Sequence, residues 1–96
     1  MFTHIVFFNL KDNSPENLEK AKSILMGMEG KIEQLRELIV GIDVVHSARS
    51  FDIALVTKFD SHEDMDNYQV HPYHVNEVLT NLRPMLESSA SVDFED

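Results

Sequence analysis

The heptapeptide Y-Q-V-H-P-Y-H, from Tyr68 to His74, gathers the groups of this chain that are best suited to proton chemistry. It contains both tyrosines and two of the five histidines. A neutral imidazole can serve as a general base near neutral pH, and a neighbouring phenol can donate a hydrogen bond to a developing enolate oxygen. One interpretation of the motif is therefore acid–base chemistry on a carbonyl compound.

The proline of this motif determines how its histidines can be placed. A residue before proline is disfavoured in the α conformation, so the chain breaks at His71, and Pro72 can begin a new helix. His74 then lies in the first helical turn, where the helix dipole favours the neutral ring. In this hypothesis Tyr68 and His74 polarise and deprotonate a substrate, and His4 from the first strand orients it. The alternative, which spacing alone favours, is that a histidine caps a helix end while the tyrosine ring packs.

A metal site in the same region is not expected. His71 and His74, with Asp64, Asp66 or Glu77 nearby, offer nitrogen and oxygen ligands. However, the proline break prevents the regular helical spacing that would aim both rings at one ion. The chain has no cysteine, no H-E-x-x-H pattern, no glycine-rich phosphate loop and no nucleophile elbow. We therefore predict that the protein uses neither a metal nor a cofactor.

The bulk properties predict one small domain over residues 1–96. Hydrophobic residues make up 43% of the chain, which is ordinary for a globular protein. Seventeen acidic and eight basic residues give a formal charge of −9, which disfavours nucleic acid and anionic membrane surfaces as partners. No leader peptide or membrane-spanning apolar run is evident in the sequence, so a cytoplasmic location is expected.

The first predicted strand, Phe2–Leu10, has two apolar faces. Alternation places Phe2, His4, Val6, Phe8 and Leu10 on one face and Thr3, Ile5, Phe7 and Asn9 on the other. A helix layer of the same chain can cover only one of them. The second face therefore predicts a partner.

A helix is predicted to begin at Ser14, as N-cap, and Pro15, as first helical residue. Its apolar stripe is Leu18, Ala21, Leu25, Met28, Ile32 and Leu35. We expect the chain to leave this helix through Ile39–Ile42, turning at Gly41.

Two strands, Val44–Ala48 and Phe51–Phe59, are expected next. A short helix capped by Ser61 follows, and then a helix beginning at Pro72 with a late kink at Pro84. A last strand is expected in residues 91–96. The order is β-α-β-β-α-β, a ferredoxin-like α+β fold with helices on one face of a four-stranded antiparallel sheet. The bare apolar face predicts a homodimer that forms through the sheet.

These segments resemble the stress-responsive dimeric α/β-barrel (Dabb) family over essentially the whole chain. The resemblance rests on H-I-V, I-V-G-I, F-D-I-A-L-V-T-K-F-D-S, Y-Q-V-H-P-Y-H and V-D-F, with Y-x-x-H-P-x-H the most specific element. It implies a ferredoxin-like protomer that pairs into a dimeric barrel, and most members have no assigned activity. A polyketide-cyclase member closes a ring by aldol chemistry without metal or cofactor. Tyr68, His74 and His4 match that cyclase pattern, and Ile53 stands where the cyclase has a further histidine.

The sequence thus predicts a homodimer that binds a small apolar or carbonyl-containing molecule near Tyr68, His74 and His4, with His71 as a further ligand-binding residue. One alternative is a cofactor-free acid–base enzyme that performs aldol cyclisation or isomerisation. Another is a haem-degrading monooxygenase, because that family shares the dimeric fold, although this chain contains no tryptophan.

Overall fold

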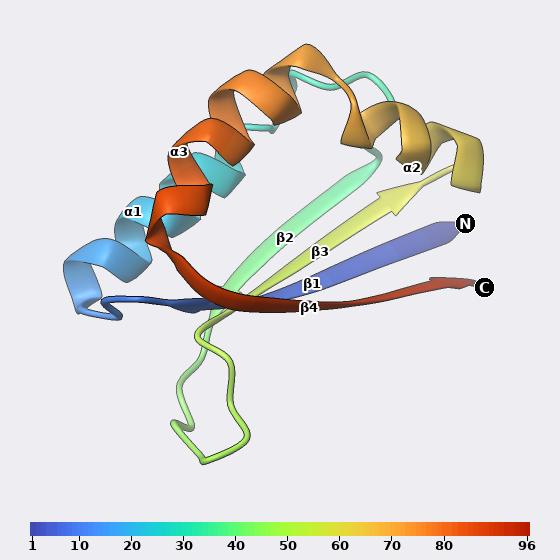
Figure 1. Ribbon diagram of the computed structural model, residues 1–96. Helices are drawn as coiled ribbons and strands as arrows, with labels where there is room; N and C mark the ends of the chain where they lie inside the picture. Colours follow the sequence, from blue (N-terminus) through green and yellow to red (C-terminus); the bar gives the residue numbers. More distant parts are fainter.

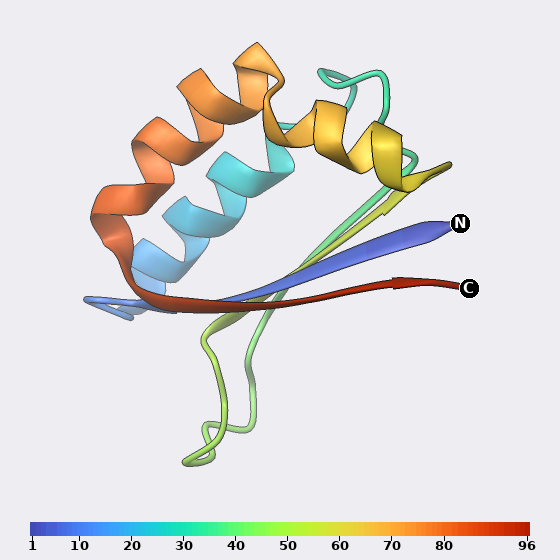
Figure 2. The same cartoon turned by 45° about the vertical axis from the view of Figure 1, so that its right-hand side comes forward.

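The computed structural model describes residues 1–96 and contains one four-stranded antiparallel sheet in the order β2-β3-β1-β4. Its helices all lie on one side of the sheet (Figures 1 and 2). The strands are β1 (Phe2–Leu10), β2 (Glu37–Ile42), β3 (Ile53–Phe59) and β4 (Leu86–Glu95). The helical elements are α1 (Pro15–Met26), α2 (His62–Gln69), the π-helical segment η1 (Tyr73–Leu79), α3 (Thr80–Leu82) and the 3₁₀ turn η2 (Arg83–Met85). The predicted ferredoxin-like fold is confirmed. None of the helices combines the length and the apolar character needed to cross a membrane.

The first helix begins as predicted but ends earlier. The Ser14 hydroxyl accepts a hydrogen bond from the Asn17 backbone N–H at 3.3 Å, and Pro15 is the first helical residue. The helix ends at Met26 rather than near Leu35, because Gly27 and Gly30 follow within four residues and Gly30 takes a left-handed φ of 75°. Met28 and Ile32 still enter the core from the turns beyond the helix, at 0% and 4% exposure. The apolar stripe therefore indicated burial correctly but not helix length.

The second strand lies elsewhere than predicted. Ile39–Ile42 belongs to β2 and pairs with β3, with Ile42 opposite Ile53, so it is not a helix exit. Val44–Ala48 is a loop, in which Val44 and Val45 are 85% and 73% exposed. The Asp43 carboxylate accepts a hydrogen bond from the His46 backbone N–H at 2.7 Å, and His46 has a φ of 57°. This turn ends the strand, and the loop projects beyond the sheet (Figures 1 and 2).

The helices of the second half begin and break at the predicted residues. The Ser61 hydroxyl caps α2 by accepting from the Asp64 backbone N–H at 3.1 Å. The chain breaks before Pro72 and resumes in η1, and Pro84 lies in the short 3₁₀ turn that ends the helical run. β4 begins at Leu86, several residues before the predicted strand, and pairs along the whole of β1.

The alternation of β1 separates the two faces of the sheet. Phe2, Phe8 and Leu10 are buried under the helices together with Leu55 and Phe59 of β3. The opposite face carries large apolar residues that no helix covers. By register they form one patch, here called the bare-face patch: Ile5, Phe7, Ile39, Val56, Val92 and Phe94.

Candidate functional site

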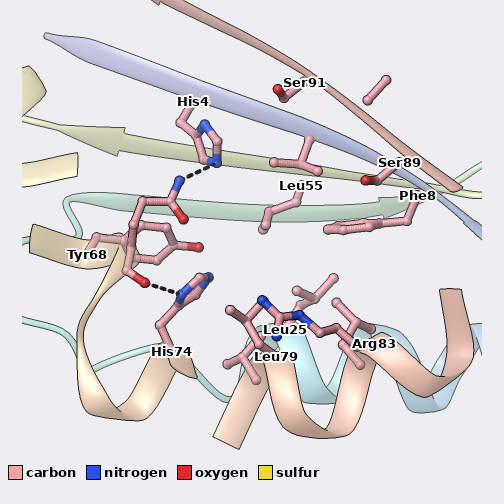
Figure 3. A pocket seen from close by; sticks show the side chains of 15 residues that line it. His4, Phe8, Leu25, Leu55, Tyr68, His74, Leu79, Arg83, Ser89 and Ser91 are labelled. Carbon is pink, nitrogen blue, oxygen red and sulfur yellow. Dashed lines mark hydrogen bonds between the residues drawn. The ribbon is translucent and has the colours of Figure 1, made fainter. Parts of the chain in front are cut away.

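A cavity of about 350 Å³ lies between the sheet and the helix layer (Figure 3). Its fifteen lining residues come from β1, β3 and β4 on the sheet side and from the helical elements on the other, and nine of them are hydrophobic. A concave site of this size, mostly apolar with a few convergent polar groups, is typical of small-molecule binding.

The polar groups at one end of the cavity are those that the sequence singled out. The ring centroids of Tyr68 and His74 are 4.4 Å apart, and those of His4 and Tyr68 are 6.3 Å apart. All three residues line the cavity, although His4 is at the opposite end of the chain from the motif. The structure therefore brings these three predicted residues together.

His74 has one nitrogen fixed by the protein and one facing the cavity. Its Nδ1 lies 3.1 Å from the Gln69 carbonyl oxygen, which can only accept, so Nδ1 carries the hydrogen. Nε2 has no hydrogen-bonding partner in the protein and lies on the cavity side of the ring (Figure 3). Burial is the largest cause of a lowered His74 pKa, and the charge of Arg83 lowers it further. The ring is thus held neutral, with the lone pair of Nε2 directed into the cavity.

This placement of His74 follows from the helix junction. Because α2 ends at Gln69, the carbonyl groups of its last turn need partners from outside the helix, and the Tyr68 carbonyl accepts from the His71 backbone N–H at 3.1 Å. Pro72 restarts the helix, and η1 runs with π-helical hydrogen bonding, a geometry often found at functional sites. His74 lies in the first turn of η1 and donates back to the Gln69 carbonyl. The junction thereby sets both the tautomer and the direction of the ring.

Tyr68 is buried, with 1% of its surface exposed, and its ring packs against Phe59 and His74. The hydroxyl contacts only the Met28 thioether sulfur, at 3.6 Å. A thioether is a weak acceptor, so this contact does little to satisfy the phenol. Burial raises the Tyr68 pKa well above its ordinary value of 10.0. The phenol therefore remains protonated and available as a hydrogen-bond donor.

His4 is held from two sides. Its Nδ1 is hydrogen-bonded to the carboxylate of Asp93, which lies directly opposite it on β4. Because a carboxylate accepts, Nδ1 is the donor, and the Gln69 amide can then donate to Nε2 at 3.4 Å. This pair of contacts fixes the His4 ring at the edge of the cavity (Figure 3).

His71 does not line the cavity. Its Nδ1 accepts a hydrogen bond from the Tyr73 backbone N–H at 3.1 Å, and its Nε2 lies 3.4 Å from the Glu33 carboxylate. Its contacts are those of a helix-junction residue. Ile53 is also outside the cavity, in the core at 1% exposure, whereas Leu55 of the same strand lines it.

Three cavity-associated residues escaped the sequence analysis: Gln69, Asp93 and Arg83. Gln69 belongs to the motif itself, but its contacts with the two histidine rings depend on where α2 ends. Asp93 could have been found from the antiparallel register that sets it opposite His4. Arg83 lies where the helical run ends, and no motif in the neighbouring sequence marks it as a site residue. No three His, Asp or Glu side chains are grouped so that they could hold a metal ion.

The fold and the cavity together define a ferredoxin-like protein with a mostly apolar cavity under its helices. Residues 2–96 match the Stress responsive A/B Barrel Domain (Dabb), and the chain belongs to that family. A stress-response A/B barrel domain-containing protein of Arabidopsis thaliana is 28% identical over 94 residues, which are 95% of this chain but only 35% of that protein.

Solved structures of the same fold include two dimers of unknown function. A dimeric ferredoxin-like protein from Thermobifida fusca is 28% identical, with 99% of this chain and 90% of the other covered, at a TM-score of 0.85. A dimeric protein from Bacteroides fragilis is 31% identical, with 99% and 95% covered, at a TM-score of 0.82. These two structural relatives are thus dimers, and the family leaves the activity unassigned.

Proposed function

We propose that the protein is a homodimer that binds a small, apolar, carbonyl-containing molecule in the cavity beneath its helices. The observation that carries this proposal is the pair of cavity-facing polar atoms, the Tyr68 hydroxyl and His74 Nε2, which have no strong partner in the protein. Both residues line the cavity, so a ligand placed there can supply the hydrogen-bonding partners that the protein does not. A carbonyl oxygen can accept from Tyr68, while the apolar remainder of the ligand contacts the hydrophobic lining.

The homodimer is proposed to form through the bare-face patch. Ile39, Val92 and Phe94 are each between 43% and 53% exposed, and Ile5, Phe7 and Val56 are only partly buried by their own chain. A contiguous apolar surface of this kind on a sheet favours association with a second, identical surface. The dimeric state of both structural relatives supports a homodimer, and the choice of surface rests on the exposure of the patch.

A second function, cofactor-free acid–base catalysis, is favoured by the orientation of His74. With Nδ1–H donated to Gln69, the neutral ring presents Nε2 as a base that can take a proton from the carbon next to a carbonyl. The Tyr68 phenol would then stabilise the developing enolate oxygen by donating a hydrogen bond. His4, oriented by Asp93 and Gln69, would fix the substrate. The simpler interpretation, that the motif only fixes a helix junction, explains the Nδ1 contacts but not the two cavity-facing atoms.

The proposal can be tested by native mass spectrometry of the purified dimer followed by a thermal-shift screen of small carbonyl and aromatic compounds. We expect compounds that stabilise the wild type to lose most of that effect in His74→Gln and Tyr68→Phe. His62→Gln is the matched control, because His62 lies on α2 outside the cavity and its only ion-pair partner is Asp66. Equal stabilisation of all four proteins would place the binding site elsewhere, and no retained ligand and no hit would favour the junction-only interpretation.

A further inference from the structure

The one charged side chain that lines the cavity has the opposite sign to the net charge of the protein. The chain carries seventeen Asp and Glu residues, yet none of them lines the cavity. Arg83 is the only Lys or Arg among the lining residues. The Asp93 carboxylate lies just behind the lining and is already hydrogen-bonded to His4. Arg83 is therefore the one charged side chain that lines the cavity itself, and it favours an anionic group on the ligand.

Arg83 has no partner within the protein. Its exposed side chain makes no hydrogen bond and no ion pair, whereas the Arg36 side chain donates to the Asp60 carboxylate at 3.0 Å. A basic residue at a helix end can be explained by the helix dipole, but no helix carbonyl accepts a hydrogen bond from Arg83. In Figure 3 its guanidinium points away from η2 towards the histidine end of the cavity. The donors of this group are therefore free to meet a ligand.

Two hydroxyl groups line the sheet side of the cavity, across from Arg83 on the helix side (Figure 3). Ser89 and Ser91 lie on β4, opposite Phe8 and Val6 of β1, and both line the cavity. Neither side chain is hydrogen-bonded within the protein. A guanidinium and nearby hydroxyl groups together offer the donors that a carboxylate accepts, and arginine binds a carboxylate through two parallel bonds.

We propose that the ligand is a carboxylic acid with a carbonyl group on its apolar body, whose carboxylate is bound by Arg83 with help from Ser89 and Ser91. The carbonyl oxygen then lies at the Tyr68–His74 end, so this inference rests on the binding function proposed above. The hydrophobic residues of the lining contact the apolar body of the ligand. Arg83 selects the acid, while the motif residues select the carbonyl.

The inference can be tested with four probes of nearly equal size, titrated into the intact dimer and followed by calorimetry. They are 4-oxo-4-phenylbutanoate, its methyl ester, 4-phenylbutanoate, which lacks the ketone, and butyrophenone, which lacks the carboxylate. For the wild type we expect the keto acid to bind about tenfold to a hundredfold more tightly than its ester, the range expected of a charge-assisted hydrogen bond. Added salt should weaken binding of the acid and leave butyrophenone unaffected.

Variants of Arg83 separate this inference from the function on which it rests. Arg83→Gln should abolish the preference for the acid over the ester, and Arg83→Lys should keep part of it, since lysine retains the charge but loses the planar fork. Arg49→Gln, in the exposed loop between β2 and β3, is the matched control and should change nothing.

An unchanged preference for the acid in Arg83→Gln, or equal binding of acid and ester to the wild type, would overturn the inference. Butyrophenone binding that depends on His74 would leave the proposed function standing in that case. If none of the four probes bound the folded dimer, both proposals would be overturned.

Discussion

Strand β1 contributes residues to both faces of the sheet, and the two faces differ in what covers them and in the groups they present. Even-numbered residues of β1 lie beneath the helices, where His4, Val6 and Phe8 line the cavity. The odd-numbered residues Ile5 and Phe7 belong to the bare-face patch, with Ile5 between Val56 and Val92. The covered face contains polar groups that lack strong partners, whereas the bare face presents apolar groups that suit a second copy. In the proposed function, the two-residue period of this strand assigns ligand binding to one face and assembly to the other.

The largest expected effect comes from removing the ring that anchors the covered face. Tyr68→Ala should lower the free energy of unfolding by about 3–5 kcal/mol, because it leaves a cavity among Phe59, His74 and Met28. Tyr68→Phe should lower it by at most about 1 kcal/mol, since the lost hydroxyl contacts only a thioether. Chemical denaturation measures both values. A large loss in Tyr68→Phe would mean that the hydroxyl serves the fold rather than a ligand.

On the bare face the expected effect is on assembly rather than on folding. Phe7→Glu places a charge within the bare-face patch. We expect it to raise the dimer dissociation constant at least about a hundredfold, because an unpaired charge would be buried in the interface. Sedimentation velocity measures the change. Val44→Glu, which alters a residue of the projecting loop, serves as the control. A dimer that survives Phe7→Glu unchanged would show that the interface lies on another surface.

A smaller effect is expected from the pH dependence of stability on the covered face. The folded protein lowers the pKa of His74 below its ordinary value of 6.5, so the unfolded chain takes up the proton first as the pH falls. The stability that depends on neutral His74 is therefore fully present above pH 6.5 and is lost as the pH falls through the folded-state pKa. His74→Gln should reduce this loss, as measured by denaturation at a series of pH values. Parallel profiles for the two proteins would contradict a buried, neutral His74.

The sequence predicted the fold and the centre of the site because both depend on local patterns. The caps at Ser14 and Ser61 and the break at Pro72 act within a few residues, and the alternation in β1 identified both faces. The Y-x-x-H-P-x-H motif identified two of the three clustered residues for the same reason, and the resemblance to the family supported all three. A local sequence pattern predicts structure well where few alternative structures would produce the same pattern.

The errors arose where a local pattern fits more than one structure. Met28 and Ile32 continue the helical spacing of α1 but reach the core from turns. Apolar residues at this spacing indicate burial, and they do not by themselves show that the segment is helical. Val44–Ala48 contains β-branched residues like a strand, yet the Asp43–His46 turn places it in a loop. Arg83 gave no signal at all, since its role depends on the distance between a helix end and β4, which no short stretch of sequence encodes.

Chemical-shift mapping is the most direct test of the claim that one face of the sheet binds the ligand and the other binds a second copy. The isotope-labelled dimer would be titrated with butyrophenone while the amide signals of β1 and the ring signals of His4, Tyr68 and His74 are followed. We predict saturable shifts of the ring signals and of their cavity neighbours, with little change at Ile39, Val56 and Phe94 of the bare-face patch. Shifts confined to the bare-face patch, or no saturable shift at the three rings, would contradict the account.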